Sequence, residues 1–118
     1  IGYHRIKPTV SGRDFFNKPM CVYQWHKEGF ELPDGAELLA SGDRFENQAF
    51  KYGDNAYGIQ FHPEVTNSMM MRWLTNAAHM LEFPGAQPHV DQVRARRRYD
   101  GETIRWLDGF LRMWLKIA

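Results

Sequence analysis

The sequence contains a single cysteine, Cys21, and no apolar run long enough to cross a membrane. One cysteine excludes an intrachain disulfide and fits a reducing compartment, so we expect a cytoplasmic protein. No signal peptide is recognisable at the N-terminus. The formal net charge is only +1, which gives no global electrostatic reason to expect binding to nucleic acid. The composition therefore argues against membrane insertion and against nucleic acid as a partner.

The sequence does contain the apolar residues that a folded core requires. Its 118 residues are enough for one small domain, and 43% of them are hydrophobic, so disorder is not expected. Internal repeats and low-complexity tracts are absent from the sequence. The chain begins at Ile1 rather than at a methionine, which fits a fragment of a longer protein.

Residues 1–65 have the pattern of short strands separated by turns. Glycine and asparagine tolerate positive φ, so Gly-Asp-Asn at 53–55 is a hairpin signal between two strands. Pro-Asp-Gly at 33–35 has the chemistry of a turn. We predict extended segments over residues 1–10, 20–25, 37–41, 47–52 and 56–61.

Residues 66–118 have a helical period instead. Thr66 or Asn67 is a plausible N-cap of a first helix, which Pro-Gly at 84–85 would stop. A weaker helix is predicted over residues 90–99. Asp100 could cap a third helix, whose apolar stripe would contain Ile104, Leu107, Leu111 and Trp114. Strands first and helices last are typical of an α+β domain when the chain is taken by itself.

The segment at residues 57–66 carries the clearest chemistry. Tyr57, Ile59 and Phe61 alternate with Gly and Gln, which predicts a strand with one buried face that ends at about His62. His62 and Glu64 lie two residues apart, so an extended backbone would place both side chains on one side. A carboxylate beside an imidazole fixes its tautomer and stabilises the imidazolium, but such a pair lacks a nucleophile.

The motif Gly-Ile-Gln-Phe-His-Pro-Glu at residues 58–64 resembles the signature of class I glutamine amidotransferases. The resemblance implies that His62 and Glu64 belong to a Cys-His-Glu triad that hydrolyses glutamine to glutamate and ammonia. It also implies an α/β fold, in which this chain is the C-terminal part of a three-layer amidotransferase domain. The chain is most similar to stand-alone members that are like the glutaminase domain of GMP synthase. Implied partners are glutamine and an ammonia-accepting synthetase; no cofactor or metal is implied.

The resemblance continues upstream, through residues 23–33. There the family has Trp-His-Gly-Asp on a loop near the bound glutamine, so His26 and Glu28 are implied to shape the substrate site. Lys27 replaces the usual Gly, and Glu28 replaces the usual Asp. The alternative interpretation is a solvated polar loop after a strand.

The family's nucleophilic cysteine lies in a Gly-x-Cys-x-Gly turn, and this sequence has no such turn. Cys21 lies in an apolar strand without flanking glycines, so we expect a buried core residue rather than the nucleophile. The chain therefore resembles only the C-terminal half of the domain. We expect it to be inactive alone, and either packed on its missing N-terminal half or self-associated.

Three other hypotheses remain. The chain could be a non-catalytic binding or scaffold module that keeps the amidotransferase fold. His-x-Glu also opens the zinc deaminase signature, but that signature needs a downstream Pro-Cys-x-x-Cys, which is missing. The basic run that contains Arg94, Arg96, Arg97 and Arg98 is interpreted as a solvated helix face rather than a nucleic-acid site.

Overall fold

A computed structural model describes residues 1–26 and 28–116. Its five strands form one antiparallel sheet in the order β2-β1-β3-β4-β5. Each predicted extended segment contains a strand, and the bounds are β1 Gly2–Pro8, β2 Met20–Gln24, β3 Glu37–Gly42, β4 Asn47–Tyr52 and β5 Ala56–Ile59. The predicted hairpin is confirmed, because β4 and β5 pair through Tyr52 and Ala56, and Gly53 between them has φ of 63°.

Strand β1 is shared between two neighbouring strands. Its first part, Gly2–Ile6, pairs with β2, whereas Ile6–Pro8 pair with β3. The sheet is curled, so the segment that follows edge strand β5 returns to the opposite edge. There the His62 backbone N–H donates to the Tyr23 carbonyl of β2 at 2.8 Å. The sheet is thereby closed just where the predicted catalytic segment begins.

The predicted end of this last strand is wrong by about three residues. β5 ends at Ile59. Gln60 makes one more backbone bond, to Gln48 of β4, and the chain then leaves β4, so that His62 bonds to β2 instead. Tyr57 is half-buried and Phe61 fully buried, as predicted, but the side chain of Ile59 is 39% exposed. Side chains of an edge strand have a neighbouring strand on only one flank, which explains this exposure.

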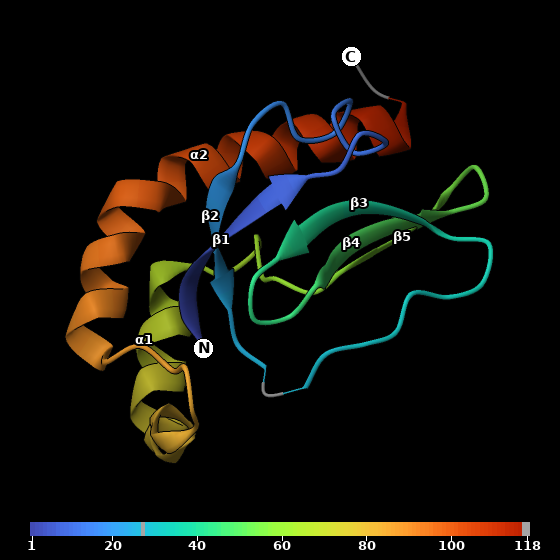
Figure 1. Cartoon of the computed structure of the whole chain (residues 1–118). Helices are drawn as coiled ribbons and strands as arrows, with labels where there is room; N and C mark the ends of the chain where they lie inside the picture. Colours follow the sequence, from blue (N-terminus) through green and yellow to red (C-terminus); the bar gives the residue numbers. More distant parts are fainter. Residues whose placement is uncertain (27, 117–118) are drawn as a thin grey trace.

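The helical half contains α1 Asn67–Asn76, a 3₁₀ helix η1 Ala78–Glu82, and α2 His89–Leu115. Thr66 is the N-cap of α1, and its hydroxyl accepts from the Met69 N–H at 3.2 Å. Both α1 and α2 lie beside β1 and β2, while β3, β4 and β5 extend away from α1 (Figure 1). No helix in the described part of the chain has the length and apolarity that a membrane crossing requires.

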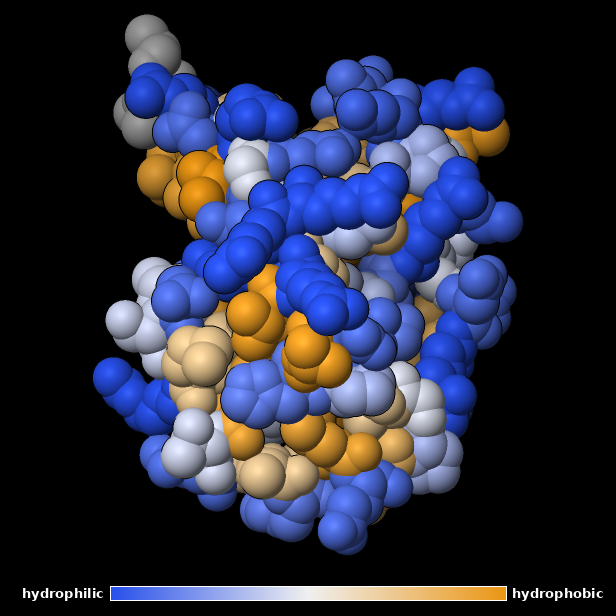
Figure 2. All heavy atoms as spheres, turned by 90° about the vertical axis from the view of Figure 1, so that its left-hand side faces the viewer, coloured by the Kyte–Doolittle hydropathy of each residue, from blue (hydrophilic) through white to orange (hydrophobic). Residues whose placement is uncertain are grey.

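The prediction of two helices separated at Asp100 is wrong. A single helix of 27 residues passes through Asp100, whose carboxylate pairs with Arg96 one turn earlier at 3.2 Å instead of capping a new helix. Part of the predicted apolar stripe faces outward: Ile104 is 55% exposed and Leu111 is 36% exposed, whereas Trp114 packs on Tyr57 of β5. Figure 2, which views the helical side of the molecule, shows apolar surface among hydrophilic side chains.

The stripe that packs on the sheet is rotated by one residue from the predicted one. Thr103 is buried, and the half-buried Trp106 ring stacks on Phe16 at 4.9 Å and on Phe110 at 5.1 Å. The Trp106 indole N–H donates to the Phe15 carbonyl at 2.9 Å. Aromatic rings bury more area than Ile or Leu, and the Trp106 indole finds an acceptor in the observed rotation, which favours the aromatic stripe on the inner face.

Two groups of buried side chains make up the core. The sheet core lies against the loop at 10–19 and contains Ile6, Phe16, Met20, Val22, Leu39, Ala40, Ala49 and Phe61. The helix core lies between β1, β2 and the helices and contains Tyr3, Tyr23, Val65, Met70 and Leu74. Because Tyr23 and Val65 belong to the helix core, this core lies directly beneath the segment that carries His62.

A buried polar contact joins the helix core to α2. The Tyr23 hydroxyl donates to Gln92 Oε1 at 2.6 Å, and the Gln92 amide nitrogen donates to the Gln87 carbonyl at 2.9 Å. Both side chains are almost fully buried, and burial raises the pKa of the Tyr23 hydroxyl. These two hydrogen bonds explain why a polar residue, Gln92, is tolerated on the inner face of α2.

We predict that Tyr23→Phe lowers the free energy of unfolding by about 1–3 kcal/mol, because it leaves a buried amide oxygen without a donor. Tyr52→Phe is the matched control, since Tyr52 is exposed on β4 and should change stability by less than about 0.5 kcal/mol. Urea unfolding of the two variants measures the difference. Equal stabilities would show that the Tyr23–Gln92 contact contributes nothing.

Candidate active site

The His62 side chain lies at the closure of the curled sheet. Its backbone is fixed by the hydrogen bond to Tyr23, and the next residue, Pro63, is buried. The imidazole itself is 32% exposed. A histidine with a fixed backbone and a partly open ring can exchange protons with a group that approaches from outside.

The carboxylate of Glu64 lies against this imidazole. His62 Nδ1 and Glu64 Oε1 are 2.8 Å apart, within the range expected of an orienting carboxylate, so the predicted proximity is confirmed. A carboxylate accepts hydrogen bonds, so the neutral ring is held in the tautomer that has its proton on Nδ1. His62 Nε2 is then unprotonated and available as a base.

Trp73 of α1 contacts the His62 ring and was not singled out from the sequence as a site residue. The two rings meet at 75° with centroids 5.2 Å apart, and Trp73 in turn packs against Tyr23 and Trp25. Met70 and Leu74 point into the helix core, so Trp73 lies on the flank of α1 that reaches His62. Helical spacing alone cannot separate the roles of the adjacent residues Trp73 and Leu74.

His26 ends a directed chain of buried amides. The Phe45 carbonyl can only accept, so the Gln48 amide nitrogen donates to it at 2.9 Å. Gln48 Oε1 then accepts from the Gln24 amide nitrogen at 2.7 Å, and Gln24 Oε1 lies 2.6 Å from His26 Nε2. His26 must therefore carry a proton on Nε2. A strand-alternation pattern could not identify the two glutamines, which are buried polar residues in β2 and β4.

The remaining ring nitrogen of His26, Nδ1, is buried and has no hydrogen-bond partner within the described residues. Burial lowers the pKa of the His26 imidazole, and the adjacent Glu28 backbone opposes the shift. The neutral ring therefore presents an acceptor nitrogen at Nδ1.

Glu28 contributes its backbone rather than its carboxylate to this region. The Gln60 amide nitrogen donates to the Glu28 carbonyl at 2.8 Å, while the Glu28 side chain is exposed. Lys27 lies outside the described residues. The Glu28 backbone is thus tied to Gln60, two residues before His62.

Cys21 is half-buried, which corrects the expectation of a fully buried residue. It alternates with Val22 along β2, but it belongs to neither the sheet core nor the helix core. It pairs across the ladder with Arg5 on β1. An apolar strand pattern does not give this depth, because the next residues of the same strand, Val22 and Tyr23, are fully buried.

Arg96 corrects the interpretation of the basic run. Arg94, Arg97 and Arg98 are exposed, but the Arg96 side chain is only 13% exposed and donates from Nη1 to the Val65 carbonyl at 3.1 Å. Its spacing of four residues from Asp100 was the available signal for an ion pair. No sequence pattern could reveal the contact with Val65, which joins residues 31 positions apart.

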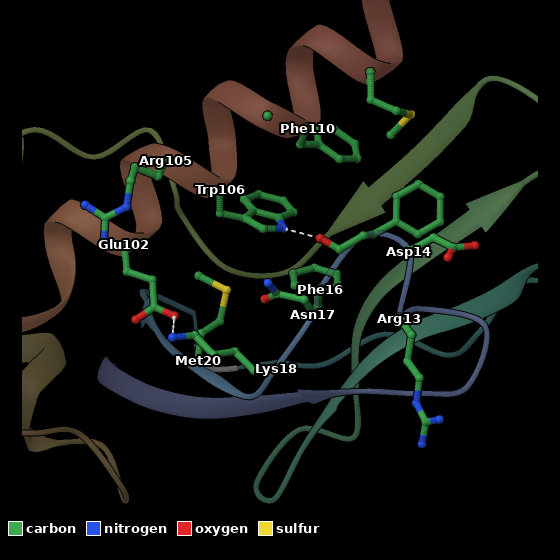
Figure 3. Close-up of a pocket in the computed structure, with 13 residues that line it drawn as sticks. Arg13, Asp14, Phe16, Asn17, Lys18, Met20, Glu102, Arg105, Trp106 and Phe110 are labelled. Atoms are coloured by element: carbon green, nitrogen blue, oxygen red, sulfur yellow. Dashed lines mark hydrogen bonds and ion pairs between the residues drawn. The ribbon is translucent and has the colours of Figure 1, made fainter.

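A cavity of about 530 Å³ opens beside α2 (Figure 3), and His62 is not among the residues that line it. It separates the loop at 13–20 from α2, where Lys18 pairs with Glu102 at 3.6 Å and Trp106 faces Phe16. A shallower groove of about 340 Å³ runs between residues 63–66 and α2, and Glu64 lines it. His26 lines two smaller cavities of about 100 and 230 Å³. Within residues 1–26 and 28–116, no three His, Cys, Asp or Glu side chains group as metal ligands.

The family model that matches this chain is described as glutamine amidotransferase class-I, and it covers residues 2–80. A glutamine-hydrolyzing GMP synthase from Neisseria meningitidis is 34% identical over 95 residues, which are 75% of this chain and 18% of that protein. One subunit of a glutamine-hydrolyzing GMP synthase from Methanosphaera stadtmanae is 47% identical over 49 residues, which are 40% of this chain and 26% of that protein.

Solved structures agree with these relatives. A glutamine amidotransferase from Thermotoga maritima has a TM-score of 0.79 and 30% identity, and the match covers 97% of this chain and 50% of that one. A glutamine amido transferase from Methylobacillus flagellatus has a TM-score of 0.89 at 23% identity, over 98% and 51%, which shows the shared fold. The chain spans about half the length of these structures and less than a third of the two curated relatives.

The buried His26 predicts how stability depends on pH. Its pKa is lowered from the ordinary 6.5 by burial, so below about pH 6.5 the unfolded chain binds a proton that the folded chain does not. The free energy of unfolding should therefore fall as the pH decreases from 6.5 towards the folded pKa. His4, whose pKa is lowered by burial as well, contributes with the same sign.

His26→Gln should remove part of this dependence, because Gln can still donate to Gln24 but does not titrate. His79→Gln, at an exposed position in η1, is the control and should keep the wild-type slope. Urea unfolding between pH 7.5 and 5 measures the slopes. An unchanged slope in the His26 variant would contradict the burial argument.

Proposed function

The chain belongs to the class-I glutamine amidotransferase family, and on that premise we propose that His62 is the general base of a glutaminase site and that Glu64 orients it. The observation that carries the proposal is the 2.8 Å contact between His62 Nδ1 and Glu64 Oε1. This contact leaves Nε2 as the free basic nitrogen, at the half-exposed end of a fixed backbone.

The proposed reaction needs a cysteine thiol from outside this chain. His62 Nε2 takes the thiol proton, and the thiolate attacks the side-chain amide carbon of glutamine. The imidazolium then gives its proton to the leaving nitrogen, which departs as ammonia and leaves a γ-glutamyl thioester. A water molecule, deprotonated by His62, hydrolyses the thioester to glutamate and restores the thiol. Glu64 stabilises the imidazolium in both halves of the reaction.

The loop that contains His26 and Glu28 is proposed to form the glutamine side of the site. Two features support this role: the tie from Gln60 to the Glu28 carbonyl, and the fixed tautomer of His26.

We further propose that the chain is the C-terminal portion of a three-layer amidotransferase domain. The chain spans about half of the solved relatives, and Ile59 on edge strand β5 and Ile104 on α2 are exposed apolar residues that additional structure would cover. The rest of the domain would supply the thiol. A thiol nucleophile works in a reducing compartment such as the cytoplasm.

The proposed acceptor of the ammonia is a synthetase. The Methanosphaera stadtmanae relative is named as one subunit of a GMP synthase, which makes a separate synthetase polypeptide the natural proposal for the partner of this chain. The non-catalytic scaffold remains a second candidate, favoured by one observation: Cys21 lies in β2 and the sequence has no Gly-x-Cys-x-Gly turn. A nucleophilic cysteine elsewhere in the intact protein would favour the catalytic hypothesis over the scaffold.

In the intact protein, His62→Ala should reduce glutamine hydrolysis by roughly 10³-fold or more, because base and nucleophile act as a unit. Glu64→Gln should retain more activity, since an amide oxygen can still accept from Nδ1 but stabilises the imidazolium less. His79→Ala, at an exposed histidine, is the control. The rate of ammonia release is measured for all three variants. Near-wild-type rates for both His62→Ala and Glu64→Gln would refute the proposed triad.

The 118-residue chain alone should not hydrolyse glutamine. Its only thiol, on Cys21, is a half-buried strand residue and not part of a nucleophile turn. We also expect self-association or retention of another polypeptide, because exposed apolar residues and the unpaired edge of β5 can bind a second chain. Ammonia release from a monomer of 13.9 kDa, defined by light scattering, would refute both expectations.

A further inference from the structure

Arg96 differs from every other arginine in the basic run of α2. Its neighbours Arg94, Arg97 and Arg98 are exposed, whereas 13% of the Arg96 side chain is exposed. A buried guanidinium is costly unless its donors are paired, so its partners must be present in the folded state.

The Arg96 guanidinium spans three elements. Nη1 donates to the Val65 carbonyl at 3.1 Å, and Nη2 pairs with Asp100 Oδ1 at 3.2 Å. Its charge also acts on Tyr3 of β1: burial raises the pKa of the Tyr3 hydroxyl to about 12, and Arg96 opposes that rise. Asp100 lies one turn away on the same helix and holds the guanidinium in place.

The hydrogen bond from Arg96 to the Val65 carbonyl holds the backbone directly after Glu64, in a segment without regular secondary structure. Residues 61–65 belong to no strand or helix, between Gln60, which still bonds to β4, and Thr66, which caps α1. The His62 N–H is bonded to Tyr23 at one end, and the Val65 carbonyl is bonded to Arg96 at the other. Glu64 lies between these two attachments, with its side chain half-exposed and free of other constraint within the described residues.

We propose that Arg96, braced by Asp100, is a positioning residue of the glutaminase site: it fixes the backbone next to Glu64 and thereby the Nδ1–H tautomer of His62. The inference rests on the proposed function of His62 and Glu64. Arg96 touches neither substrate nor the reacting atoms, so it acts only through Glu64. Small displacements of an orienting group reduce rates strongly, since reacting atoms must be held within fractions of an ångström.

The test compares Arg96→Met with Arg97→Met in the intact protein. Both changes remove one positive charge from α2, but only the first removes the Val65 contact, and Asp100 is exposed enough to be solvated when left alone. Arg96→Met should lower kcat by about 10- to 100-fold with little change in KM, while Arg97→Met stays at the wild-type rate. Arg96→Lys keeps the charge and should fall between them.

A second measurement separates positioning from mere stabilisation. The ¹⁵N chemical shifts of the His62 ring report which nitrogen carries the proton in the neutral form. Wild type and Arg97→Met should be mainly Nδ1–H, and Arg96→Met should shift towards Nε2–H. A purely structural role would lower the unfolding free energy and leave the tautomer of the folded protein unchanged, which would overturn the proposal.

The remaining outcomes distinguish failure of the positioning role from failure of the proposed function. If Arg96→Met fails to fold, judged by circular dichroism, Arg96→Lys and Asp100→Asn replace it, and unchanged kcat and tautomer in both refute the positioning role. If His62→Ala keeps full activity, the proposed function fails, while the tautomer comparison still tests whether Arg96 holds Glu64. If His62→Ala is inactive and Arg96→Met is fully active with a wild-type tautomer, only the positioning role fails.

Discussion

The hydrogen bond from the His62 N–H to the Tyr23 carbonyl closes the curled sheet and fixes the start of the candidate site. Tyr23 makes three kinds of contact at once. Its carbonyl holds His62, its hydroxyl binds Gln92 of α2 at 2.6 Å, and its ring packs with Trp73 at 6.3 Å. One strand residue therefore couples the site segment to both helices. Loss of that closure would free the segment that carries Glu64 as well as His62.

The site pairs an ordered scaffold with an irregular functional segment. The β4–β5 hairpin ends at the sheet edge, and residues 60–66 then lie across the helix core without regular structure. Their geometry depends on individual contacts to Tyr23, Trp73 and Arg96. Such segments can present side chains that a strand or helix could not bring together, but each contact then matters separately.

Local features of the sequence predicted the strands, the hairpin, the Thr66 cap and the proximity of His62 to Glu64, because period, turn chemistry and spacing act over a few residues. Long-range contacts decided the rest. Asp100 could cap a helix or pair with Arg96, and only the fold selects the pair. Helix α2 has two adjacent apolar stripes, and the hydrogen bond from the Trp106 indole to the Phe15 carbonyl favours the stripe with Trp106 as the packed one. Trp73 and Arg96 reach the site only through tertiary packing.

The central claim is that His62 and Glu64 are the base and orienting half of a cysteine-dependent glutaminase site. Determination of the intact protein's crystal structure tests it most directly, through the distance from His62 Nε2 to the nearest cysteine sulfur. The account predicts a thiol other than Cys21 at about 3–4 Å, on the side of the ring opposite Glu64. A refined intact structure with no cysteine sulfur near Nε2, or with Glu64 turned away from Nδ1, would contradict it.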